Sequence, residues 1–110
     1  MAVPNFADYV TAKGGVLVRP NPCVASEVGV DGITVNAIAP GLVSTPLTEV
    51  GREGHIPMPD AGFEMVRQMQ PIPRSMMPED LVGTLSFLTS DDAAFITGQM
   101  VHVDGGMVRV

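Results

Sequence analysis

The feature that most constrains the fold is an apolar stretch from Gly32 to Ala39, which runs directly into Pro40-Gly41. Only Thr34 and Asn36 within it are polar. A strand with so little polarity on either face is typical of a parallel sheet, in which helices cover both faces. We therefore predict a strand over 32–39 that ends at Pro40-Gly41, within an α/β domain.

Downstream of this strand the pattern changes to loops and helices. Glycine and proline recur over 42–77, which predicts a loop with short helices. A helix is expected over 78–89, where apolar residues recur at helical spacing, and a second strand over 99–103. Strands joined through helices form a right-handed unit with parallel strands. We predict one partial domain over 1–110, in which two strands alone would be marginally stable.

The helix expected ahead of the strand, over 7–28, contains two prolines. Pro20 and Pro22 each lack a hydrogen-bond donor, and a proline costs about 3 kcal/mol in a helix interior. We therefore predict that this helix breaks between Val18 and Cys23 and then resumes as far as Val28.

Tyr9 and Lys13 lie four residues apart in the same helix, so a phenol stands beside an ammonium on one helix face. The ammonium favours the phenolate and lowers the tyrosine pKa from about 10. Such a tyrosine can exchange a proton with an alcohol or a carbonyl near neutral pH. The same spacing also occurs in surface helix pairs with no chemical role, so the pair alone leaves both interpretations open.

Composition argues against several kinds of partner. The net charge is −6, which disfavours nucleic acid and anionic membrane surfaces. Cys23 is the single cysteine, so an internal disulfide is excluded, and no cluster of Cys and His indicates a metal site. We see neither a signal peptide nor an apolar run long enough to span a membrane. We expect a cytoplasmic protein that binds no metal.

Several motifs follow one another along the chain in a fixed order. They are Tyr9-x-x-x-Lys13, the stretch from Gly32 to Gly41, Thr45, Pro78-Glu79-Asp80, Phe95-Ile96-Thr97-Gly98-Gln99 and Val103-Asp104-Gly105-Gly106. Together they resemble the C-terminal half of a short-chain dehydrogenase/reductase over nearly the whole chain. The resemblance implies the C-terminal portion of a Rossmann-type doubly wound parallel sheet that lacks the N-terminal strands. It also implies NAD or NADP as the cofactor and a small alcohol or ketone as the substrate.

Two catalytic residues follow from the resemblance. Tyr9 would be the acid/base, and Lys13 would lower its pKa and bind the nicotinamide ribose, so both would also contact the cofactor. In the family, the helix that carries this pair and the C-terminal strand form subunit contacts. The resemblance therefore also implies a homo-oligomer.

The cofactor-binding residues implied by the resemblance follow the first strand. Pro40 and Gly41 would shape the loop beside the nicotinamide, and Val43 would meet the carboxamide through its backbone. The Thr45 hydroxyl would bind the carboxamide or a phosphate. The segment from 46 to about 70 would correspond to the family's substrate lid.

The chain also departs from the family pattern. It has no Gly-x-Gly-x-x-Gly turn after a strand to bind the pyrophosphate, and no serine a dozen residues ahead of Tyr9. Residues 18–24 do not look like the family's helix, which suggests a local reading-frame disturbance as a hypothesis. We expect an NAD(P)-dependent oxidoreductase in a truncated form that is inactive alone. The alternatives are an interaction or oligomerisation module and a remnant without activity, and whether the chain is an enzyme stays open.

Overall fold

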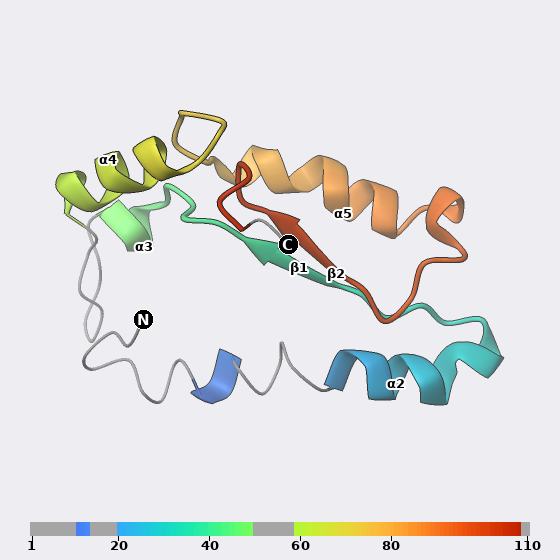
Figure 1. Cartoon of the computed structure of the whole chain (residues 1–110). Coiled ribbons are helices and arrows are strands. Elements are labelled where there is room, and N and C mark those ends of the chain that lie inside the picture. The colour runs from blue at the N-terminus through green and yellow to red at the C-terminus, as the bar shows by residue number, and fades with distance from the viewer. Residues whose placement is uncertain (1–10, 14–19, 50–58, 109–110) are drawn as a thin grey trace. The chain divides into compact units, whose positions relative to one another are not determined.

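The protein is described by a computed structural model that covers residues 11–13, 20–49 and 59–108 (Figure 1). Residues 11–13 are helical. In chain order, the named elements are α2 (Pro20–Val28), the 3₁₀ turn η1 (Gly29–Asp31), β1 (Ala37–Pro40), α3 (Pro46–Glu49), α4 (Asp60–Met69), the 3₁₀ turn η2 (Pro78–Leu81), α5 (Val82–Leu88), the 3₁₀ turn η3 (Asp91–Ala93) and β2 (Met100–Val103). Helices alternate with strands, which confirms the predicted α/β class.

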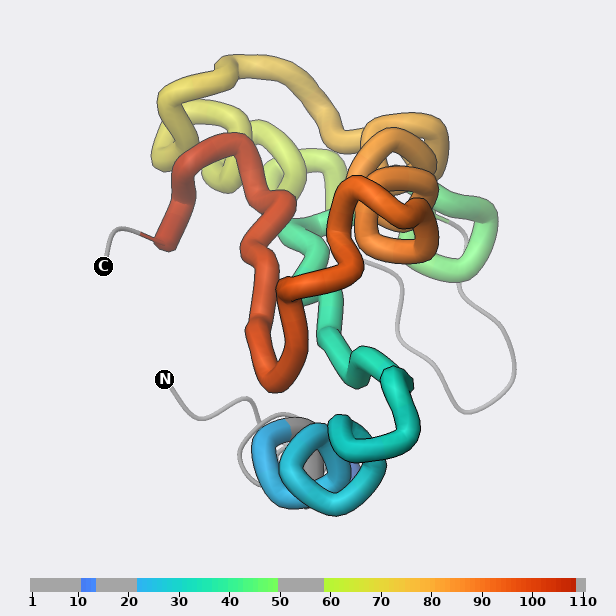
Figure 2. The backbone as a smooth tube through the Cα atoms, turned by 90° about the vertical axis from the view of Figure 1, so that its right-hand side faces the viewer, coloured from blue at the N-terminus to red at the C-terminus, as the bar shows by residue number. Residues whose placement is uncertain are grey.

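The two strands pair in a small parallel sheet. The Ala37 amide donates to the Gln99 carbonyl at 2.8 Å, and the Gly41 amide donates to the Val103 carbonyl at 2.9 Å. The step from 37 to 41 equals the step from 99 to 103, so both strands run in the same direction. Figures 1 and 2 show them side by side. The parallel arrangement brings both carboxyl ends to one edge of the sheet.

The first strand is shorter than the predicted 32–39, because regular pairing begins only at Ala37. Ahead of it, a side chain replaces the backbone ladder. The Asn36 side-chain NH₂ group donates to the Ile96 carbonyl at 2.8 Å. The Gln99 backbone N–H donates to the Asn36 side-chain oxygen at 3.1 Å. Polar side chains compete with backbone pairing in this way, and the regular strand starts only after Asn36. The Asn36 side chain thus satisfies a backbone carbonyl 60 residues away in the sequence.

The predicted break between Val18 and Cys23 stays a prediction, because residues 14–19 lie outside the described part of the chain. Helix α2 begins at Pro20 and continues to Val28, so Pro22 also lies in its first turn. The first four backbone N–H groups of a helix have no partner within it, and a proline there therefore removes no hydrogen bond.

Internal contacts divide the chain into two compact units, residues 1–37 with 90–101 and residues 38–89 with 102–110. Among the described residues of the first unit, Ala25 and Ala93 are buried, and Gly98 packs against Ala25. The boundary between the units falls inside both strands, so the single domain that we predicted stays a prediction.

The second unit buries the side chains of Phe63, Met76, Gln70 and Asp104. Phe63 lies in α4, Gln70 and Met76 lie between α4 and η2, and Asp104 directly follows β2.

Helix formation over the predicted range 78–89 starts as η2 and continues as α5. The Asp80 carboxylate accepts the Met77 amide at 2.8 Å, which satisfies an N–H at the start of the helix. No residue of α5 is buried, and Leu85 is 55% exposed. The apolar face predicted for this helix therefore covers no core within the described part of the chain.

Candidate active site at the carboxyl edge of the sheet

The loop after β1 and the turn after β2 lie against each other, both within the second unit. The Gly41 amide donates to the Val103 carbonyl at 2.9 Å. A Cβ on Gly41 would stand 3.0 Å from Asp104 Cα and 3.2 Å from Asp104 Cβ, which is too close for ordinary contact. Only glycine permits this approach without a shift of Asp104, so Gly41 sets how closely the loop and the turn lie. In open α/β sheets, ligands bind outside the carboxyl ends of the strands.

Asp104 holds the turn after β2. Its carboxylate accepts the amides of Val108 and Gly106, each at 2.9 Å. The Val108 bond is the largest of several causes that lower the pKa of this carboxyl, and burial opposes them. Gly105 and Gly106 have φ values of 66° and 84°, which favour glycine. The carboxylate is therefore used by the turn, as we expected for Asp104-Gly105-Gly106.

Val43 ties the loop after β1 to the segment that follows α4. It forms an isolated parallel bridge with Met76, and the neighbouring Ser44 amide donates to the Met76 carbonyl at 2.8 Å. Met76 is buried, so this anchor is protected from water. The loop is thus held from both sides, by β2 and by the segment between α4 and η2.

Thr45 caps α3. Its carbonyl accepts the amides of Thr48 and Glu49, at 3.0 and 2.9 Å, and its hydroxyl oxygen accepts the Thr48 amide at 3.3 Å. The Thr48 hydroxyl donates to the Val43 carbonyl at 2.8 Å. The Thr45 hydroxyl also lies 3.2 Å from the Thr48 hydroxyl, to which it can donate its one proton, so a ligand would take that proton in exchange for this bond. The Val43 carbonyl keeps a second lone pair. Both residues therefore fit a ligand that carries an amide or an anionic oxygen.

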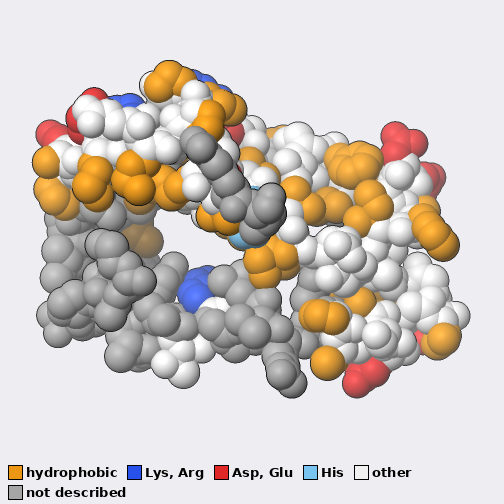
Figure 3. All heavy atoms as spheres, in the orientation of Figure 1, with side chains coloured by type: hydrophobic (Ala, Val, Ile, Leu, Met, Phe, Trp, Pro, Cys, Tyr) orange, Lys and Arg blue, Asp and Glu red, His pale blue; other side chains and the backbone are white. Residues whose placement is uncertain are grey.

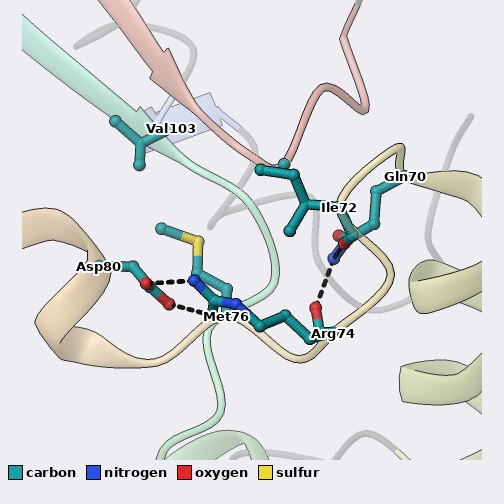
Figure 4. A pocket seen from close by; sticks show the side chains of 7 residues that line it. Gln70, Ile72, Arg74, Met76, Asp80 and Val103 are labelled. Atoms are coloured by element: carbon teal, nitrogen blue, oxygen red, sulfur yellow. Dashed lines mark hydrogen bonds and ion pairs between the residues drawn. The ribbon is translucent and has the colours of Figure 1, made fainter.

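A pocket of about 200 Å³ lies beside this edge, within the same unit (Figure 4). Its lining comes from residues 70–80, from the end of β2 and from the turn after it: Gln70, Ile72, Arg74, Met76, Asp80, Val103 and Gly105.

Arg74 and Asp80 form a two-pronged ion pair in this pocket, at 2.6 and 2.7 Å. The Arg74 hydrogen bonds, helped by the Met77 amide, lower the pKa of Asp80 to about 2. Sequence reasoning read Asp80 only as a residue of the first helical turn. It missed the pair because six residues separate the partners and nothing local connects them.

The structure brings together four of the six predicted site residues. Pro40, Gly41, Val43 and Thr45 follow one another in the loop after β1, where Pro40 is exposed and the others are half-buried. Lys13 has an exposed side chain and belongs to the first unit. Tyr9 lies outside the described residues. The roles of all six stay predictions.

Neither a metal centre nor a membrane span is found in the described part of the chain. No group of three or more His, Cys, Asp or Glu side chains there could hold a metal ion. No described helix has the length and apolar character that crossing a membrane requires.

Comparison with known proteins decides the family. The family model described as enoyl-(acyl carrier protein) reductase matches residues 1–108. The chain belongs to the short-chain dehydrogenase/reductase family. It is 41% identical over 109 residues to a 3-oxoacyl-(acyl-carrier-protein) reductase of Synechocystis sp., a match that covers 98% of this chain and 40% of the relative. The predicted family is therefore confirmed.

Solved structures of this short-chain dehydrogenase/reductase fold agree. A 4-hydroxyisoleucine dehydrogenase complexed with NADH superposes with a TM-score of 0.80 at 35% identity, and the match covers 98% of this chain and 42% of that one. A putative gluconate dehydrogenase from Agrobacterium tumefaciens superposes with a TM-score of 0.81 at 31% identity, over 100% and 41%. The chain thus corresponds to part of a Rossmann-type fold and spans about two-fifths of the length of these relatives.

Proposed function

We propose that this chain contributes the nicotinamide-side half of an NAD(P)-dependent oxidoreductase that transfers hydride between the nicotinamide and an alcohol or ketone. The observation that carries the proposal is the loop from Pro40 to Thr45, held at the carboxyl edge of the sheet by Gly41 and Val43. The Thr45 hydroxyl and the Val43 carbonyl suit the carboxamide of a nicotinamide. When bound, the reduced nicotinamide would supply the hydride to a ketone, and the oxidised form would accept it from an alcohol.

The proton chemistry falls to Tyr9 and Lys13. Tyr9 would give its phenolic proton to the carbonyl oxygen during reduction and take it back during oxidation. The Lys13 ammonium would lower the tyrosine pKa and bind the nicotinamide ribose. These roles rest on the family motif that the two residues match.

The substrate class that we favour is a ketone on an aliphatic chain. The Synechocystis relative is named as a 3-oxoacyl-(acyl-carrier-protein) reductase. In this chain, Met65, Met69 and Ile72 are 54%, 59% and 53% exposed, and hydrophobic side chains gather along one edge of α4 (Figure 3). Methionine adapts readily to irregular apolar partners, which suits an acyl chain. Both NAD and NADP fit this proposal, and so does the cytoplasmic location predicted from the sequence.

A chimera tests the proposal directly. Residues 1–108 would replace the matched segment of the Synechocystis reductase, which then supplies the remaining parts of the fold. We expect oxidation of reduced nicotinamide, followed by its absorbance, when a 3-oxoacyl thioester is added. Tyr9→Phe should reduce the rate at least about hundredfold. Gly83→Ala on α5, where an added Cβ meets nothing within 4 Å, should leave the rate unchanged. A folded, inactive chimera, or one that Tyr9→Phe does not slow, would reject the proposal.

A second candidate, a self-association module, is favoured by the exposed side of α5. Val82 and Leu85, three residues apart on one helix face, are 61% and 55% exposed, and exposed apolar side chains of this kind mark a candidate interface. Sedimentation of the purified chain separates the cases. A concentration-dependent dimer or tetramer is expected, whereas a monodisperse monomer at every concentration would count against this role.

A further inference from the structure

The first residue after α4 is a buried glutamine with two bonds to the backbone. Gln70 is only 8% exposed, and its side-chain nitrogen donates to the Ile72 carbonyl at 2.7 Å and to the Arg74 carbonyl at 2.5 Å. Figure 4 shows the side chain turned toward the Arg74 carbonyl. One amide group therefore closes the turn that redirects the chain after α4.

The same turn packs on the carboxyl edge of the sheet. The Ile72 amide donates to the Gly105 carbonyl at 3.1 Å. A Cβ on Gly105 would lie 3.2 Å from Gln70 Cδ, and one on Gly106 would lie 2.9 Å from Pro71 Cγ. The end of α4 and the turn after β2 are thus in close contact.

The far end of this turn reaches the loop after β1. Ser75 accepts a hydrogen bond from Arg67 of α4 at 2.9 Å, and the next residue, Met76, forms the bridge to Val43. Residues 70–76 therefore connect the lid helix, the turn after β2 and the loop that follows β1. We call residues 70–76 the brace.

We propose that Gln70 is a positioning residue that holds the brace closed, so that α4 and the loop after β1 keep one arrangement relative to each other. The inference rests on the proposed function only in taking α4 as the cover of the substrate site. Gln70 would touch neither substrate nor cofactor, and it would act through the carbonyls of Ile72 and Arg74.

The chemistry of the amide suggests a test. Only an NH₂ group at this position offers two protons to two carbonyls at once. A glutamate there would donate one proton when neutral and would repel both carbonyls when ionised. Burial and the two carbonyls favour its neutral form, which raises its pKa above the ordinary value of about 4.3. Gln70→Glu should therefore open the brace at about pH 8 and close it in part at about pH 5.

The charged groups around the position keep their state over this range. Arg74 is paired with Asp80, whose pKa is about 2. The pKa values of Asp104 in the adjacent turn and of Glu64, which pairs with Arg67, are also lowered. His102, whose charge acts on Asp104, is present in both chains. Protection in the variant is therefore compared with that of the unsubstituted chain at the same pH, and a difference that changes between pH 5 and 8 is assigned to residue 70.

Hydrogen exchange on the full chain shows whether the brace is closed, through the protection of backbone amides that bond across it. The reporters are the amides of Ile72 and Ser44, which bond across it, and the Gly98 amide in the first unit, which donates to Val35 at 2.7 Å, is the reference. We expect Gln70→Glu to lower the protection of both reporters about tenfold or more at about pH 8, to recover part of it at about pH 5, and to leave Gly98 unchanged. Gln68→Glu, the same change on the exposed side of α4, removes the bond from Gln68 to Glu64 but leaves Arg67 paired with Glu64, so it should leave all three amides unchanged.

The inference is overturned if the Ile72 and Ser44 amides are unprotected in the unsubstituted chain, or if Gln70→Glu leaves their protection unchanged. It is also overturned if the loss of protection is equal at both pH values, if the Gly98 amide loses protection as well, or if Gln68→Glu causes the same loss. In the chimera, Gln70→Glu should raise the KM for the ketone severalfold at about pH 8 while kcat changes little. An inactive chimera would reject the proposed function, and the role of Gln70 in the brace would then be decided by hydrogen exchange alone.

Discussion

Gly41→Ala probes the contact on which the candidate site depends. The new Cβ would meet Asp104 Cα at 3.0 Å and Asp104 Cβ at 3.2 Å, whereas carbon atoms pack best at about 3.5–4.0 Å. Asp104 cannot yield freely, because its carboxylate is held by the amides of Gly106 and Val108. The strands must therefore separate where the Gly41 amide bonds to Val103.

Overpacking of this kind costs about 1–3 kcal/mol. For a chain of this size, each kcal/mol lowers the melting temperature by roughly 4–8 °C. We expect a cooperative melt by circular dichroism, and Gly41→Ala should lower its midpoint by at least about 4 °C. It should also abolish the exchange protection of the residue 41 amide.

Gly83→Ala is the matched control. It lies in α5 and its Cβ would meet nothing within 4 Å, so alanine should stabilise the helix by up to about 1 kcal/mol. The reasoning fails if the melting midpoint of Gly41→Ala equals or exceeds that of the unsubstituted chain while Gly83→Ala behaves as expected. A melt without a cooperative transition would show instead that the chain does not fold on its own.

Three further predictions follow from the same geometry. The Arg74 hydrogen bonds hold the pKa of Asp80 at about 2, below its ordinary value of 3.8, so the carboxylate stabilises the fold above about pH 4 and loses this contribution as the pH falls through 2. Asp80→Asn should therefore lower the urea midpoint near neutral pH but not below about pH 2. An equal lowering at both pH values would show that the ion pair with Arg74 is not the cause. Asn36→Ala leaves the Ile96 carbonyl and the Gln99 amide without their partner and should cost about 1–3 kcal/mol in thermal unfolding, whereas a loss under about 0.5 kcal/mol would mean that water replaces these bonds. The chain alone should bind NAD(P)H no more tightly than about millimolar, because no glycine-rich turn supports the pyrophosphate, and a clear calorimetric titration at micromolar cofactor would refute this.

Local sequence patterns predicted the elements whose signals lie within a few residues. The apolar stretch that ends at Pro40-Gly41 indicated a strand, and apolar residues at helical spacing indicated a helix over 78–89. Family motifs in order predicted the short-chain dehydrogenase/reductase family, which the comparisons confirm. The cost of Pro20 and Pro22 depends on their position in a helix, and both lie in the first turn of α2.

The contacts that shape the candidate site join residues far apart in the chain. The packing of Gly41 on Asp104, the bridge from Val43 to Met76 and the bonds of Asn36 depend on which segments the sheet brings together. No pattern within one segment carries that information. The sequence by itself determined that a strand ends in a glycine and that a threonine follows. Only the tertiary structure decided what that glycine packs against, because parallel pairing aligns two strand ends that are more than sixty residues apart.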